Sequence, residues 1–338
     1  MNILYSNSFR SRVGGLISVV AISFVVLACG SQGATSQSTG TVHLKYASVL
    51  AATALNNSDV VQTLIDRTKS RLDIQTFYSG QLGGEADELS GVESGTIDMA
   101  AITDITLAQV EPAINIIELP YFWKDQDTVN RLISEGTIGQ KLMADLESKG
   151  LKGLAIGQLG PRTVLSKKPI NSISDVKGMK VRVLPGDLFV SEWSAWGADP
   201  VQIDAPEVVP ALQTGTVAAV DSNATGFLSL KWYQSAKYIA QTDHQYTTEF
   251  LVMNLKKWNS LPPDVQQMIQ SALKDGVKLN EQRAAKADTD AIAQMAGEGI
   301  TVTHPDSAGF RDAVQPVWKK YTPQIGALLV AQAEDLQK

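Results

Sequence analysis

From Val42 onward the sequence alternates between short apolar segments with strand periodicity and longer segments with helical spacing. The strand patterns lie at 42–46, 72–77, 97–102, 151–156, 180–183 and 216–220. Strands separated by helices of about 10–15 residues predict parallel sheets that are covered by helices on both faces. Pro262-Pro263 precedes a helical pattern from about 264 to 297, and a helix of that length, roughly 50 Å, could bridge two domains.

The composition excludes several classes of protein. The length of 338 residues suits two domains, and 44% hydrophobic with 19% charged residues excludes a disordered chain. The net charge of −6 argues against nucleic acid as a main partner. A single Cys excludes a disulfide framework, and no two of the three His lie within one helical turn, so neither a metal nor a cofactor is expected.

The common enzyme motifs are missing from the sequence. It contains no GxSxG, no GxGxxG after a strand, no phosphate-binding P-loop and no HExxH. The glycine pair in 157–160 (GQLG) is too short for a phosphate-binding loop. The sequence therefore favours a binding protein over an enzyme.

The N-terminus has the features of an export signal. Arg10 and Arg12 precede an uncharged run over 13–28, and the only Cys follows it. This arrangement resembles a bacterial lipoprotein signal, which predicts cleavage after residue 28 and a lipid on Cys29; the alternative is an ordinary signal peptide with an incidental Cys. Residues 29–40 are rich in Gly, Ser, Thr and Gln and indicate a flexible tether. We expect an extracytoplasmic protein that is anchored to a membrane by its lipid.

Two arginines are the most informative charged residues. Arg182 interrupts the apolar strand pattern of 180–183, where a guanidinium is costly unless an anion pairs with it. That anion is either a bound ligand or an internal Asp or Glu. Arg162 follows Gly160-Pro161 and either begins a strand that faces a cleft or lies on the surface. Phe189 and Trp193 are candidates for the apolar wall of a binding site, or for the core.

Six segments follow one another along the chain: QLGGEADELSGVESGTIDMA (81–100), LPYFWKD (119–125), GPRTVLSKKPINSISDVKGMKVRV (160–183), GADPVQIDAPEVVPALQTGTV (197–217), AKYIAQTDH (236–244) and WNSLPPDVQQMI (258–269). Together they resemble the DctP-type extracytoplasmic solute receptors of TRAP (tripartite ATP-independent periplasmic) transporters.

The resemblance implies a two-lobed α/β fold of the periplasmic-binding-protein kind, with parallel or mixed sheets flanked by helices. Crossing strands and a long helix would join the lobes, which would close over an organic acid anion. Residues 41–159 with about 248–287 would form lobe I, and 160–247 with about 288–338 would form lobe II. The closed receptor would deliver its ligand to the membrane subunits of the transporter.

The same resemblance assigns roles to particular residues. Arg182 would pair with the ligand carboxylate, and Arg162 would be a second arginine that faces the ligand. A third polar contact would fall on Ser222 or Asn223. Glu85 is a further candidate contact. The resemblance allows metal assistance at the ligand through Asp221 or Glu85, but the spacing of these residues does not support it. Two other functions stay open, namely a sensor module that presents its ligand to a signalling receptor and an extracytoplasmic enzyme that acts on an organic acid.

Overall fold

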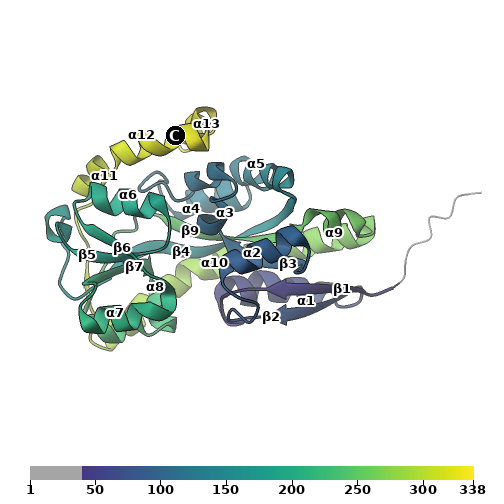
Figure 1. Cartoon of the computed structure of the whole chain (residues 1–338), viewed down its shortest axis with the longest axis horizontal. Coiled ribbons are helices and arrows are strands. Elements are labelled where there is room, and N and C mark those ends of the chain that lie inside the picture. Colours follow the sequence, from purple (N-terminus) through teal and green to yellow (C-terminus); the bar gives the residue numbers. More distant parts are fainter. Residues whose placement is uncertain (1–39) are drawn as a thin grey trace, which may run out of the picture. The chain divides into compact units, whose positions relative to one another are not determined.

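The predicted alternation of strands and helices is present in the computed structural model, which describes residues 40–338 (Figure 1). The signal peptide, Cys29 and nearly all of the predicted tether lie outside the described residues. The strands are β1 Val42–Ala47, β2 Leu72–Phe77, β3 Met99–Thr103, β4 Leu151–Ser166, β5 Lys180–Val183, β6 Asp199–Gln202, β7 Ala219–Asn223, β8 Tyr238–Ala240, β9 Tyr246–Asn254 and β10 Thr301–Thr303.

Helices fill most of the connections between these strands. The α-helices are α1 Gln62–Thr68, α2 Glu85–Ser94, α3 Asp104–Leu107, α4 Gln126–Val129, α5 Thr137–Asp145, α6 Asp187–Ala195, α7 Val208–Thr214, α8 Ala224–Ser229, α9 Leu255–Ser260, α10 Pro263–Gly297, α11 Ala308–Ala313, α12 Gln315–Ile325 and α13 Ala327–Leu336. A one-turn π-helix, η1 Asn57–Val61, leads into α1. No helix of the described part is both long enough and apolar enough to cross a membrane.

The strands form a mixed sheet in two groups that share β4. In the first group β1 is parallel to β2 and β3, while β9 is antiparallel to both β3 and β4. In the second group β5 is parallel to β6 and β7, and the distal part of β4 is antiparallel to β7 and β8. The predicted α/β class with parallel or mixed sheets is therefore confirmed.

β4 is one strand of 16 residues, whereas the sequence pattern indicated two separate pieces. Glycines cause the difference. A Cβ at Gly157 would lie 2.2 Å from Oδ1 of Asn56, so glycine is needed there for close packing and does not mark a turn. At Gly160 the backbone has φ of +100°, and the β4–β9 register shifts between Gln158 and Gly160. The lobe boundary predicted between 159 and 160 falls inside this strand and stays a prediction.

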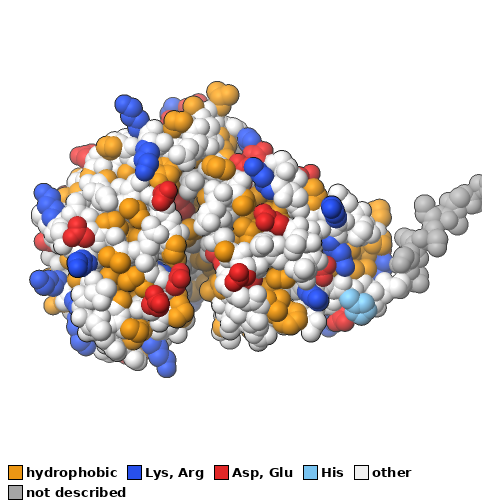
Figure 2. Space-filling model, viewed as in Figure 1, with side chains coloured by type: hydrophobic (Ala, Val, Ile, Leu, Met, Phe, Trp, Pro, Cys, Tyr) orange, Lys and Arg blue, Asp and Glu red, His pale blue; other side chains and the backbone are white. Residues whose placement is uncertain are grey.

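The long helix predicted over 264–297 is confirmed as α10, Pro263–Gly297. Its first half buries Val265 and Ile269 in a core that also contains residues of β1 and β9. Its second half buries Ala291 and Met295 in another core, with residues of β7 and α8. The helix thus packs against both groups of strands. In Figure 2 the surface is hollowed between the part that carries α7 and α8 and the part that carries α1 and α2.

Candidate functional site

Arg182 lies near the carboxyl end of β5 and is only 1% exposed. Its Nε donates to the carbonyl oxygen of Ile203 at 2.7 Å, and its Nη1 donates to the carbonyl oxygen of Asp221 at 3.4 Å. Its guanidinium carbon stands 5.2 Å from the ring centroid of Trp232. Backbone carbonyls and an aromatic face therefore fix the orientation of the guanidinium without neutralising its charge.

The remaining nitrogen of Arg182, Nη2, is buried and has no hydrogen-bond partner. Within residues 40–338 no carboxylate forms an ion pair with this side chain, so the internal Asp or Glu that the sequence left open as its partner is not found. Burial, followed by the nearby charge of Arg162, lowers the pKa of Arg182 to about 10. The site therefore holds a buried cation with a free donor, and an anion that accepted from Nη2 would stabilise it.

Arg162, on β4, already has a carboxylate partner. Its Nη2 lies 2.9 Å and its Nε 3.1 Å from Oδ1 of Asp221, and its Nη1 donates to Thr247 Oγ1 at 3.2 Å. Burial disfavours its charge, but Asp221 and then Glu118 outweigh that effect, and the pKa of Arg162 is raised. The charge of this arginine is therefore compensated within the protein, and a ligand contact by Arg162 stays a prediction.

Asp221 lies on β7 beside β4 because Val164 pairs with it in the sheet register. Trp193 Nε1 donates to its Oδ2 at 2.8 Å. Burial alone would raise the pKa of Asp221, yet Arg162 and then His244 hold it well below its usual range. The carboxylate is thus ionised and held from two sides.

The two aromatic residues that the sequence left as site wall or core are both buried, and a contact of either with a ligand stays a prediction. Trp193 is fully buried and Phe189 is 2% exposed. Phe189 stacks under the guanidinium of Arg162, with 4.9 Å between the guanidinium carbon and the ring centroid. Both side chains contact the Arg162–Asp221 ion pair and help to hold it in place.

Three buried side chains could hold a metal ion, namely Glu192, Asp221 and His244, each of which offers a ligand atom within 4.8 Å of the others. Neither carboxylate oxygen of Glu192 has a hydrogen-bond partner, although its Oε1 lies 3.8 Å from His244 Nε2, and burial, with Asp221 next, raises its pKa well above the usual value. A cation there would compete with Arg162 for Asp221 Oδ1, which lies 3.5 Å from His244 Nε2. Histidine spacing could not indicate this group, because its members come from α6, β7 and the segment before β9.

Ser222 and Asn223 end β7 beside Asp221, and both are partly exposed. Asn223 caps α8, where its Oδ1 accepts from Gly226 N at 2.8 Å and its Nδ2 donates to the Leu159 carbonyl at 3.0 Å. The hydroxyl of Ser222 forms no hydrogen bond within the described residues. Ser222 therefore has the freer polar group, and the choice between the two residues as a ligand contact stays a prediction.

A second set of polar groups lies in the first strand group, where the chain leaves the carboxyl ends of β1 and β3. Glu85, the first residue of α2, accepts from Thr103 N at 2.6 Å and from Thr103 Oγ1 at 2.8 Å. The carboxyl group of Glu88, one turn later, lies by the Val49 amide just after β1, but neither of its oxygens has a hydrogen-bond partner of good geometry. Burial, with the charge of Glu85 next, raises the pKa of Glu88 to about 8.

Glu249 of β9 lies deeper at the same edge, paired in register with Thr103. It accepts from Asn56 Nδ2 at 2.5 Å, its Oε1 has no partner, and burial raises its pKa to about 7. The edge at the end of β3 and the edge at the end of β5 adjoin, because the residues that follow these strands are in contact. A Cβ at Gly186, which follows β5 and precedes α6, would lie 3.8 Å from Ile105 of α3, which follows β3. Carboxyl ends of strands are where open α/β sheets bind ligands, and here two such edges meet.

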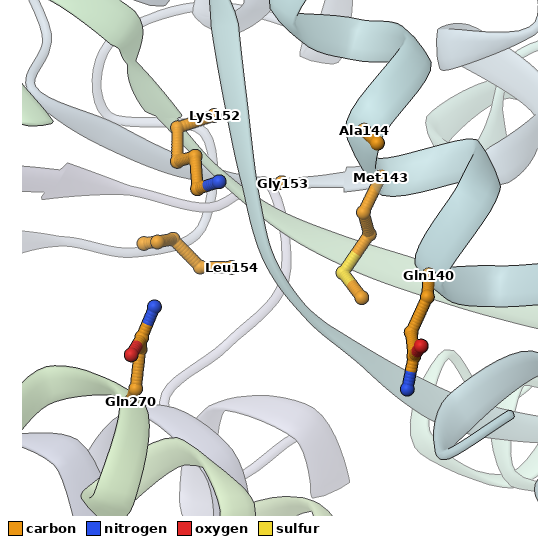
Figure 3. A pocket seen from close by; sticks show the side chains of 7 residues that line it. All are labelled: Gln140, Met143, Ala144, Lys152, Gly153, Leu154 and Gln270. Carbon is orange, nitrogen blue, oxygen red and sulfur yellow. The ribbon is translucent and has the colours of Figure 1, made fainter. Parts of the chain in front are cut away.

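A separate cavity of about 220 Å³ lies away from these residues, between α5, β4 and α10 (Figure 3). Its lining residues are Gln140, Met143, Ala144, Lys152, Gly153, Leu154 and Gln270. Lys152, the only cation in this lining, pairs with Glu147 at 2.7 Å and lies over the ring of Trp258. The cavity thus offers no free charge for an anion, unlike the surroundings of Arg182.

Comparison with known proteins gives a consistent result. The model of the family "bacterial extracellular solute-binding protein, family 7" (DctP) matches residues 51–324. The chain is 30% identical over 280 residues to the 2,3-diketo-L-gulonate-binding periplasmic protein YiaO of Escherichia coli, covering 81% of this chain and 85% of that protein. It is 26% identical over 272 residues to the C4-dicarboxylate-binding periplasmic protein DctP of Rhodobacter capsulatus, covering 78% and 80%.

Among solved structures, the fold is similar to a TRAP periplasmic solute-binding protein from Sulfitobacter with bound β-D-galacturonate. The TM-score is 0.81 at 26% identity, and the match covers 87% of this chain and all of the other. The predicted two-lobed solute-receptor fold and the resemblance to TRAP receptors are thereby confirmed.

Proposed function

Because the chain belongs to the bacterial extracellular solute-binding proteins of family 7, a family of TRAP-transporter solute receptors, we propose that it captures an organic acid anion through Arg182. The observation that carries the proposal is the unpartnered, buried Nη2 of Arg182 at an edge where strands end. A ligand carboxylate would accept from Nη2 and supply the counter-charge that residues 40–338 do not. The Arg162–Asp221 pair helps to orient Arg182, since the backbone carbonyl of Asp221 accepts a hydrogen bond from Arg182 Nη1.

Capture would proceed by closure of the two strand groups around the ligand. A carboxylate that enters the cleft loses water, and the fixed guanidinium replaces that hydration once the site is shut. Binding shifts the population toward the closed form by the difference in the ligand's affinity for the two forms. The closed form would then deliver the anion to the membrane subunits of the transporter.

The proposal is tested by calorimetry on Arg182→Ala with the organic acid that most stabilises the wild type in a thermal-shift screen. Loss of one member of a desolvated charge pair costs about 2–5 kcal/mol, so we expect affinity to fall by roughly 30-fold to several thousand-fold. Arg182→Lys should also bind poorly, because an ammonium cannot form the planar two-bond contact.

Arg67→Ala is the matched control, since Arg67 pairs with Asp275 and both side chains are about half exposed. We expect it to bind as the wild type does. Unchanged affinity in a folded Arg182→Ala protein would refute the proposed role of Arg182.

We further propose that the mature protein is periplasmic and tied to a membrane through Cys29, as the N-terminal sequence predicts. Cys29→Ser should abolish membrane attachment while leaving ligand affinity unchanged. Blocking the lipoprotein signal peptidase should leave a larger precursor on an immunoblot. Unaltered fractionation of the Cys29→Ser protein would refute the anchor.

A further inference from the structure

Resting on the proposed function, we infer that the ligand carries one carboxylate and that its remaining polar groups are neutral hydroxyls, so that dicarboxylates are rejected. At the polar edges formed by residues 40–338, Arg182 is the cation without a carboxylate partner, and the other charged groups described there are acids or the paired Arg162. Charge balance in a desolvated site therefore sets the class of ligand.

The first part of the charge count concerns the two arginines. Arg162 and Asp221 form a buried ion pair at 2.9 Å, so this arginine adds no net charge with which to neutralise a second ligand carboxylate. Of these two arginines, only Arg182 keeps a buried donor, Nη2, without a hydrogen-bond partner. One guanidinium can neutralise one carboxylate.

The second part concerns the acids behind the pair. Glu118 and Glu192 are fully or almost fully buried, and none of their four carboxyl oxygens has a hydrogen-bond partner of good geometry. Both groups lie close enough to Arg162 that, when ionised, they raise its pKa. A second ligand anion that reached toward Arg162 would therefore meet these carboxyl groups in addition to Asp221.

The third part concerns the opposite edge, in the first strand group. Glu85, Glu88 and Glu249 lie there, and within the described residues none of them forms an ion pair with a Lys or Arg. The free oxygens of Glu88 and Oε1 of Glu249 are hydrogen-bond acceptors of a kind that ligand hydroxyls satisfy. A ligand carboxylate at this edge would find no cation to neutralise it, whereas ligand hydroxyl groups would donate to the free oxygens.

The chemistry that fits these three observations is a hydroxylated monocarboxylic acid, with its carboxylate on Arg182 and its hydroxyls toward Glu88. Among similar proteins, the Sulfitobacter structure holds galacturonate, a monocarboxylic sugar acid, while the Rhodobacter relative is named for C4-dicarboxylates. The balance of charges around Arg182 therefore favours a monocarboxylic acid as the ligand of this chain.

The experiment compares acids that differ by one carboxylate. Calorimetry on the wild type would use D-galacturonate with D-galactarate, D-glucuronate with D-glucarate, and succinate. D-gluconate controls for the loss of the sugar ring, because it differs from D-glucarate only by a hydroxymethyl group in place of a carboxylate. We expect a monoanion to bind at least about 30-fold more tightly than its dianionic counterpart. This factor corresponds to the lower end of the free-energy cost of leaving one buried charge unpaired.

Two variants test the cause of that selectivity. Asp221→Asn keeps the shape of the side chain and releases the charge of Arg162, so it should narrow the gap between monoanion and dianion at least about tenfold. Above pH 8, where Glu88 is ionised, Glu88→Gln removes a negative charge from the other edge without touching that pair and should also narrow the difference in affinity between monoanion and dianion; it serves if Asp221→Asn does not fold. Glu93→Gln, an exposed position on the same helix, should leave the gap unchanged.

A dianion that binds the wild type as tightly as its matched monoanion would overturn the inference. If that binding were lost in Arg182→Ala, the proposed function would still stand and only the ligand class would be wrong. If the protein bound neutral sugars such as D-galactose as tightly as the acids, both the ligand class and the proposed role of Arg182 would be refuted.

Discussion

Replacement of Glu249 by Gln should weaken the pH dependence of stability. Glu249 is fully buried on β9, and burial raises its pKa from 4.5 to about 7. The folded protein therefore holds a proton that the unfolded chain releases above pH 4.5. The stability contributed by that proton is fully present below pH 4.5 and is lost as the pH rises through 7.

The magnitude follows from the shift of 4.5 to about 7. At about 1.4 kcal/mol per pH unit, the wild type should lose roughly 2–3 kcal/mol from this group between pH 5 and pH 8. A Gln can still accept the hydrogen bond that Asn56 donates, but it does not titrate. The free energy of unfolding of Glu249→Gln should therefore fall less over this range, by about that amount.

The assay is urea denaturation of the ligand-free protein at pH 5, 6, 7 and 8, followed by tryptophan fluorescence. Glu93→Gln, at an exposed position of α2, is the control and should retain the wild-type slope. An identical pH slope in Glu249→Gln and the wild type would refute the reasoning, because the buried carboxyl group would then not be the source of the proton.

Two further predictions concern packing. Gly157→Ala should destabilise the protein by about 1–3 kcal/mol, because its Cβ would lie 2.2 Å from Oδ1 of Asn56. Gly297→Ala is the control and should not destabilise it in this way, because no atom lies within 4 Å of the added Cβ. Equal urea denaturation midpoints for the two variants would contradict this prediction. Trp193→Phe should cost about 1–3 kcal/mol by removing the 2.8 Å hydrogen bond to Asp221, and denaturation at wild-type urea concentrations would argue against that bond as a support of the site.

The sequence predicted the elements whose signals are local. The apolar segment 180–183 and the helix after Pro262-Pro263 appear where their periodicity placed them. Arg182 could also be singled out from the sequence alone, because a charged residue within an apolar strand pattern is unusual whether or not its partner is known. The family resemblance rested on ordered segments along the chain and was equally accessible.

Long-range pairings were not accessible in the same way. The partner of Arg162 is Asp221, which is 59 residues away in sequence and adjacent only because β4 and β7 pair. Nothing local in the sequence indicates the role of Gly157, which is to let Asn56 approach β4. For Trp193 the sequence left two roles open, the wall of a site and the core, because one sequence cannot tell a side chain that touches a ligand from one that holds a nearby carboxylate in place.

The most direct test of the central claim is a crystal structure of the protein with its bound organic acid, in which the distance from Arg182 Nη2 to the ligand is measured. We predict a carboxylate oxygen at about 2.8 Å from Nη2, with Asp221 still bonded to Arg162. A ligand whose carboxylate lies away from Arg182, or one that displaces Asp221 from Arg162 and leaves Nη2 unpartnered, would contradict the account.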